Sequence, residues 1–169
     1  MNLLRITLGA ISGVVATGPM TVAMTKLHRK LPDADRYPLP PREITMKLAD
    51  ESGLAEKLGP TARSAATFLA HFCYGAAAGA LFGAGSKKPG PARGVLFGLF
   101  VWTVSYLGLL PRAGVLSSAT DHPASRNALM IVAHVIWGLT LGYLLETFLH
   151  DSEDSAAFAA SNRTHRDRA

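Results

Sequence analysis

The chain has 169 residues, of which 49% are hydrophobic and 17% are charged, with a formal net charge of +5. This length suffices for one ordinary domain, but the composition is more apolar than that of a typical soluble protein. The basic residues are spread among connections and helix ends, which argues against nucleic acid as a partner. The single cysteine, Cys73, excludes an intrachain disulfide framework and a cysteine pair for metal or redox chemistry.

Charged residues are absent from four stretches of at least 18 residues each, namely residues 6–24, 64–86, 94–111 and 127–145. A bilayer core about 30 Å thick needs roughly 20 helical residues, with about 17 as the lower limit. None of the four stretches carries the polar stripe of a soluble amphipathic helix. We therefore predict an all-α polytopic membrane protein with four transmembrane helices, over residues 3–24, 63–85, 93–110 and 124–149.

The segments outside these spans differ in character. In the first connection, Pro41 can occupy a helix start, and Ile44 and Leu48 lie four residues apart on one helical face. This pattern predicts a short interfacial helix over residues 41–50. Residues 151–169 are small and polar, which predicts a disordered tail after a membrane domain over residues 1–150.

One pattern occurs twice: residues 70–81 and residues 133–144 both read A-H-x-x-(aromatic)-G-x-x-x-G-x-L. The first and third spans also share a G-x-x-x-G, and each is followed by a proline–arginine pair. This order of features indicates a duplicated two-helix hairpin, whose copies would be parallel because each has an even number of spans. A chance match between helices rich in alanine and glycine is the alternative.

Small residues form ridges on all four predicted spans. Apolar helices gain little from meeting in lipid, so close backbone approach at such residues drives their association. We expect these ridges to pack the four helices against each other, and a homodimer face is the alternative use of one of them. The predicted packing positions are Gly9, Gly13, Gly75, Gly79, Gly83, Gly94, Gly98, Gly138 and Gly142.

Two histidines lie on the glycine-bearing faces, since His71 precedes Gly75 by one helical turn and His134 precedes Gly138 in the same way. Both are therefore expected to face the bundle interior. An ionisable group at membrane depth is a functional hypothesis by default. The predicted polar intramembrane site consists of His71, His134, Tyr74, Tyr106 and Trp137.

Three interpretations of the histidine pair stay open. Neutral imidazoles can join helices by hydrogen bonds to Thr17, Thr103, Tyr106 or each other. The pair can line a path for protons or a small solute. As the third interpretation, His71 and His134 can hold haem b by bis-histidine ligation.

Enzymatic chemistry has little support in the sequence. It contains no nucleophile motif, metalloprotease motif or phosphate-binding loop, and we assign no catalytic residue, metal site or cofactor. Arg42 and Arg112 lie at helix ends, where they can bind a lipid phosphate or another anion, or anchor the membrane interface.

Several of these elements resemble the YagU-like family of small bacterial inner-membrane proteins, whose biochemical role is not established. The resemblance rests on L-P-P-R at residues 39–42, the small-residue helix near His71, a basic turn, Leu110-Pro111, and His134 with Trp137. It covers residues 3–149, although the first connection here is shorter. The resemblance implies an inner-membrane protein with cytoplasmic amino and carboxyl ends, whereas the raw count of basic residues favours the opposite orientation.

The sequence therefore predicts a membrane protein of structural or accessory type without enzymatic activity, with the lipid bilayer as its main partner. A transport unit for protons or a small solute that uses His71 and His134 is the first alternative. A haem-binding membrane protein is the second.

Overall fold

The computed structural model describes residues 3–166, and side chains are described for residues 3–155. This part of the chain is helical and contains no strand. Four segments are long and apolar enough to cross a bilayer: Leu3–His28, Pro60–Gly85, Pro91–Arg112 and Ala124–Ser155. The predicted all-α, multi-pass membrane protein is thus confirmed.

The spans correspond to α1 (Leu3–His28), α3 (Pro60–Gly85), α4 (Pro91–Val104) with its continuation, and α6 (Ala124–Arg166). The short helix predicted over residues 41–50 is α2 (Pro40–Glu51). Proline occupies the start of α2, α3 and α4, where its missing amide leaves no hydrogen bond unmade. Short 3-10 turns occupy Asp33–Asp35, Ala55–Lys57 and Ala119–Asp121.

The third span is not a uniform α-helix. After α4 it continues as a π-helical turn, η3 (Ser105–Leu109), and as α5 (Leu110–Arg112). The amide of Leu110 bonds the carbonyl of Ser105, five residues earlier. Pro111 follows directly and cannot donate an amide hydrogen, which accounts for a local change of helical pitch at this point.

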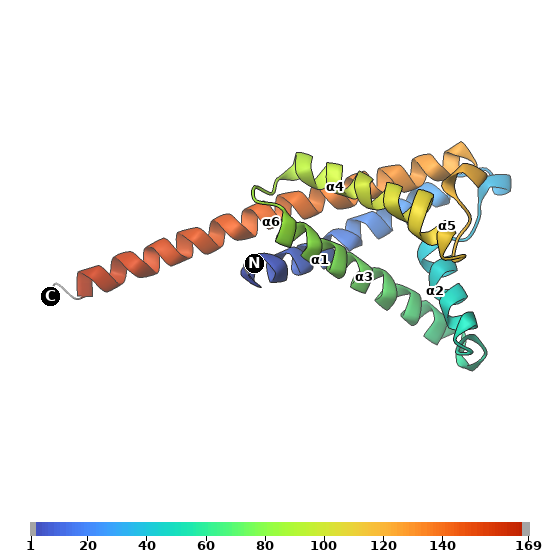
Figure 1. Ribbon diagram of the computed structural model, residues 1–169, viewed down its shortest axis with the longest axis horizontal. Helices are drawn as coiled ribbons and strands as arrows, with labels where there is room; N and C mark the ends of the chain where they lie inside the picture. The colour runs from blue at the N-terminus through green and yellow to red at the C-terminus, as the bar shows by residue number, and fades with distance from the viewer. Residues whose placement is uncertain (1–2, 167–169) are drawn as a thin grey trace.

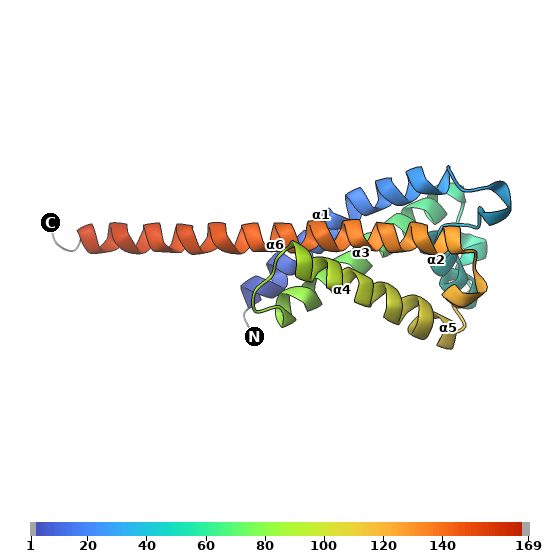
Figure 2. The same ribbon diagram turned by 90° about the horizontal axis from the view of Figure 1, so that it is seen from above.

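The helices form two hairpins that meet along α1 and α6 (Figures 1 and 2). α1 packs against α3, α4 packs against α6, and the two pairs are joined by contacts between α1 and α6. By contrast α3 and α4 make few contacts, and they diverge toward the end of the bundle that holds α2. The core lies along α1 and α6, where Ala16, Leu141 and Leu145 are completely buried.

The outer surface of the spans is apolar. Leu81, Leu96 and Phe100 expose 69%, 67% and 61% of their surface. Large apolar side chains pointing outward from several helices would be costly in water and match the acyl chains of a bilayer.

The predicted tail differs from the structure, because α6 continues without a break from Ala124 to Arg166. Residues 151–166 contain neither proline nor glycine and are rich in alanine, so their intrinsic helix propensity extends the preceding helix past the bundle (Figure 1). The expectation of disorder is therefore wrong for residues 151–166, and residues 167–169 lie outside the described part of the chain.

Candidate intramembrane binding site

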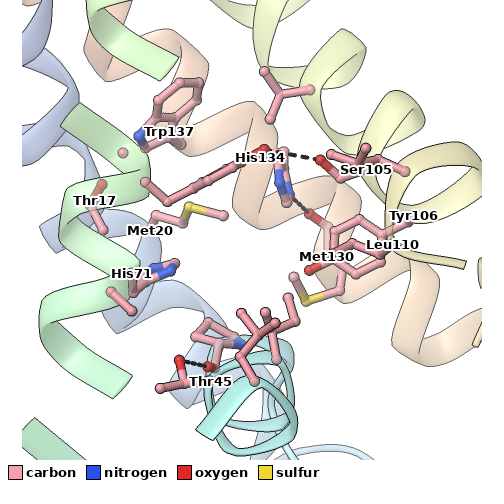
Figure 3. Close-up of a pocket in the computed structure, with 18 residues that line it drawn as sticks. Thr17, Met20, Thr45, His71, Ser105, Tyr106, Leu110, Met130, His134 and Trp137 are labelled. Carbon is pink, nitrogen blue, oxygen red and sulfur yellow. Dashed lines mark hydrogen bonds between the residues drawn. The ribbon is translucent and has the colours of Figure 1, made fainter. Parts of the chain in front are cut away.

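A cavity of about 310 Å³ fills the space between the diverging helices α3 and α4. It collects residues from α1, α2, α3, α4, η3, α5 and α6, most of which Figure 3 shows. All five residues of the predicted polar intramembrane site line it: His71, Tyr74, Tyr106, His134 and Trp137. Its volume lies at the lower end of the range for small-molecule sites in proteins.

The imidazole of His134 is held in a defined orientation. Its side chain is only 5% exposed, and Nδ1 lies 2.7 Å from the carbonyl oxygen of Met130, one turn earlier on α6. Because a carbonyl can only accept, Nδ1 carries the proton, and Nε2 of the neutral ring is an acceptor. The ring of Tyr106 packs edge-on against the imidazole, with 5.9 Å between the two ring centroids.

His71 is placed differently. Its Nε2 is buried, and its imidazole makes no hydrogen bond to the described residues. A buried polar atom without a partner costs about 1–3 kcal/mol, and such atoms call for a ligand or an ordered water. The cross-helix hydrogen bonds expected of a packing role are thus not seen for His71, and His134 bonds its own helix.

Trp137 and Tyr74 connect different parts of the bundle. The indole Nε1 of Trp137 donates to the carbonyl oxygen of Gly13 on α1 at 3.3 Å. The hydroxyl of Tyr74 on α3 lies 3.0 Å from Oγ of Ser105, at the start of the π-helical turn. This second bond spans the cavity between the two diverging helices.

α2 closes the end of the cavity. Ile44 and Leu48, which were predicted to share a face, both line it together with Pro41 and Thr45. The apolar face of this helix therefore covers the site, and the position of α2 determines how far the cavity is open.

A buried arginine attaches α2 to α6. Nη2 of Arg126 donates to Oε2 of Glu43 at 2.8 Å, and the arginine side chain is 6% exposed. Nη1 lies 2.6 Å from the imidazole of His122, and the guanidinium stands 5.2 Å from the centre of the Tyr37 ring. We call Arg126, Glu43, His122 and Tyr37 the latch.

Sequence reasoning missed the latch, since Arg126 reads as one of several charges in the third connection. The spacing of four residues between His122 and Arg126 was the one available signal. Glu43 lies 83 residues away from Arg126, and no local pattern connects the two positions.

A second hollow adjoins the cavity and shares Pro41 and His71 with it. We call this hollow the interfacial groove. It is bordered by α1, the start of α2 and the start of α3, and its remaining residues are Thr21, Met24, Thr25, His28, Pro38, Leu39, Arg42, Ser64, Thr67 and Phe68. Of the two predicted anion-binding arginines only Arg42 lies here, whereas Arg112 is exposed on α5 and lines neither hollow.

The predicted glycines lie where helices touch. Gly9 and Gly13 of α1 meet the backbone of Gly75, Gly79 and Gly83 on α3. In the other hairpin, Gly94 and Gly98 of α4 meet the backbone of α6 around Gly138 and Gly142. All nine positions thus make contacts within the chain, and the homodimer stays a prediction.

The contacts of the two hairpins follow one scheme. Gly79 faces Gly9 and Gly13, and Gly142 faces Gly90 and Gly94 in the corresponding way. If the hairpin is duplicated, these contacts make Gly13 correspond to Gly94. Aligning the first glycines of the two G-x-x-x-G motifs would instead match Gly9 with Gly94, which differs by one helical turn.

Within residues 3–155, no group of three or more His, Cys, Asp or Glu side chains could hold a metal ion. Comparisons of the chain with protein-family models, with curated proteins and with solved structures found no match.

Proposed function

We propose that this chain is a non-enzymatic accessory protein of a bacterial inner membrane that binds a small lipid-soluble molecule between α3 and α4. The observation that carries the proposal is the cavity of about 310 Å³, whose lining is mostly apolar and includes the imidazole-bearing residues His71 and His134. An apolar pocket with a few convergent polar groups is the usual form of a small-molecule site. The cavity lining contains no carboxylate and no thiol, which supports binding over catalysis.

The proposed orientation has both chain ends in the cytoplasm and places the proline–arginine connections on the outer side. It rests on the resemblance described above. In this orientation α2 and the interfacial groove face the periplasmic side of the bilayer.

The binding proposal is tested by photolabelling. Protein in phosphatidylcholine nanodiscs is exposed to a dodecanol that carries a photoreactive diazirine, and labelled peptides are located by mass spectrometry. We expect saturable labelling around Met20 and Met130, which unlabelled dodecanol suppresses. Lipid-facing positions such as Leu96 and Phe100 should be labelled without saturation.

Two variants of α1 form a matched pair for this experiment. Met20 is 5% exposed and lines the cavity, so Met20→Trp should fill it and abolish the saturable labelling. Val22 is 53% exposed on the same helix, and Val22→Trp should leave the labelling unchanged. Equal, non-saturable labelling of cavity and outer surface in the wild-type protein would contradict the proposal.

Transport is the second candidate, favoured by the position of His71 on both the cavity and the interfacial groove. Vesicles loaded with a pH-sensitive dye would report proton movement, and His71→Leu should abolish it while the protein still folds. The matched control is His150→Leu, since His150 is exposed on α6. Wild-type vesicles no more permeable than empty ones would remove this candidate.

A further inference from the structure

The interfacial groove carries an uncompensated positive charge. Arg42 is exposed at its edge, and its guanidinium makes no hydrogen bond or ion pair with the described residues. No acidic side chain lines the groove, and the neighbouring Glu43 is bound by Arg126. A guanidinium without an acidic partner favours an anion, which it can hold with two parallel hydrogen bonds.

The hydroxyl groups that line the groove contribute little to binding an anion. Thr21, Thr25, Thr67 and Ser64 each donate to the carbonyl oxygen four residues earlier on their own helix. They can therefore only accept further hydrogen bonds. Nε2 of the groove residue His28 lies 2.7 Å from the carbonyl oxygen of Tyr37, so Arg42 is left as the group that recognises an anion.

His71 stands at the junction of the two hollows. It lines both of them, and its Nε2 has no partner among the described residues. A ligand extending from the groove into the cavity passes the His71 side chain. The two hollows thus combine an anion-binding end with an apolar end, as an amphipathic molecule requires.

The size of the cavity limits the apolar part of such a molecule. Its volume of about 310 Å³ lies at the lower end of the range for small-molecule sites. One acyl chain of medium length fits this volume, whereas the two long chains of a membrane phospholipid do not.

We infer that the ligand is a single-chain amphiphile with an anionic head, whose chain occupies the cavity and whose head is bound by Arg42 in the interfacial groove. This inference rests on the proposed function and adds the chemical class of the ligand. Arg42 determines the preference for an anion, and the cavity determines the length of the chain.

The test uses the photolabelling assay with three competitors at about pH 8, where a carboxylic acid is ionised. Dodecanol, dodecanoate and dodecyl phosphate are compared at equal mole fraction in the nanodisc lipid. We expect dodecanoate or dodecyl phosphate to suppress labelling of the cavity about tenfold more effectively than dodecanol, as a charge-assisted hydrogen bond implies. The stronger of the two identifies the head as a carboxylate or a phosphate.

Arg42→Gln should remove the advantage of the anions while leaving competition by dodecanol unchanged. Arg112→Gln is the matched control, because Arg112 also follows a proline at a helix end but lines neither hollow. It should retain the full preference for anions.

Two failures are distinguishable in this design. Saturable labelling with no advantage for either anion, or an advantage that survives Arg42→Gln, would overturn the inference and leave the proposed function standing. Absence of saturable labelling by the neutral probe would overturn the proposed function itself.

Discussion

Arg126 and Glu43 form an ion pair of 2.8 Å that joins the amino-terminal part of α6 to the first turn of α2. The arginine is 5% exposed and also contacts His122, so its charge is satisfied entirely by groups at this end of the bundle. Because α2 closes the cavity, this pair holds the cover of the proposed binding site in place.

Removing the carboxylate of the latch should destabilise the protein. Glu43→Gln leaves the buried guanidinium without its charged partner, at an expected cost of about 1–3 kcal/mol in the free energy of unfolding. Thermal unfolding in detergent micelles should show the loss as a lower Tm. Glu51→Gln on the same helix is the control, since Glu51 pairs with Lys47 at the surface and should contribute less than about 1 kcal/mol. Equal Tm values for the two variants would contradict a structural role of the latch.

The latch should also make stability depend on pH. Burial lowers the pKa of His122 below its ordinary value, and the positive charge of Arg126 lowers it further. The folded protein therefore favours the neutral ring, which accepts from Arg126. The contribution of His122 to the free energy of unfolding is fully present above the ordinary pKa of about 6.5. It is lost as the pH falls through the lowered pKa of the folded protein.

This pH dependence is measurable as the change of Tm between about pH 7.5 and pH 5, on either side of the histidine range. We expect the decrease to be smaller in His122→Gln, whose amide keeps an acceptor but does not titrate. A variant with the same slope as the wild-type protein would show that protonation of His122 has no part in it.

The close approach of α1 and α3 should not tolerate a methyl group at Gly79. A Cβ there would meet the carbonyl oxygen of Gly9 and would lie 2.8 Å from Cα of Gly13. Backbone atoms cannot rotate out of the way as a side chain can. Gly79→Ala should therefore push the two helices apart and lower the free energy of unfolding by about 1–3 kcal/mol.

Gly85→Ala on the same helix provides the comparison for this substitution. No neighbouring atom lies within 4 Å of a Cβ at Gly85, so its Tm should equal or slightly exceed that of the wild-type protein. If Gly79→Ala unfolds at the same temperature, close backbone contact does not hold this hairpin together.

The haem hypothesis is tested by the visible absorption spectrum of the purified protein. Both histidines line one cavity, but its volume of about 310 Å³ lies at the lower end of the range for small-molecule sites, and haem is a large ligand. We therefore expect no Soret band, even after incubation with haem. A low-spin Soret band that His134→Leu removes would show that the cavity widens to admit the cofactor.

Much of the architecture could be predicted because it depends on local composition. Uncharged stretches long enough to cross a bilayer identify the spans regardless of how they pack. The spacing of one helical turn between His71 and Gly75 places both on one face, so the helical period alone indicated a shared interior for the predicted polar residues.

The long continuation of α6 could also have been expected from composition, and the sequence interpretation gave too much weight to polarity. Residues 151–166 are polar, but they contain no helix-breaking residue after a stable span. Polarity predicts where a segment avoids lipid, and it does not by itself predict disorder.

The sequence by itself determined the spans, the small-residue ridges and the inward direction of the two histidines, since each depends on neighbours within a few helical turns. Only the tertiary structure decided that α3 and α4 diverge, that α2 closes the space between them, and that Arg126 reaches Glu43. These contacts join residues far apart in the chain, and their partners are selected by shape and charge in three dimensions. The cavity exists because the two hairpins meet mainly along α1 and α6, a property of their packing that no single segment contains.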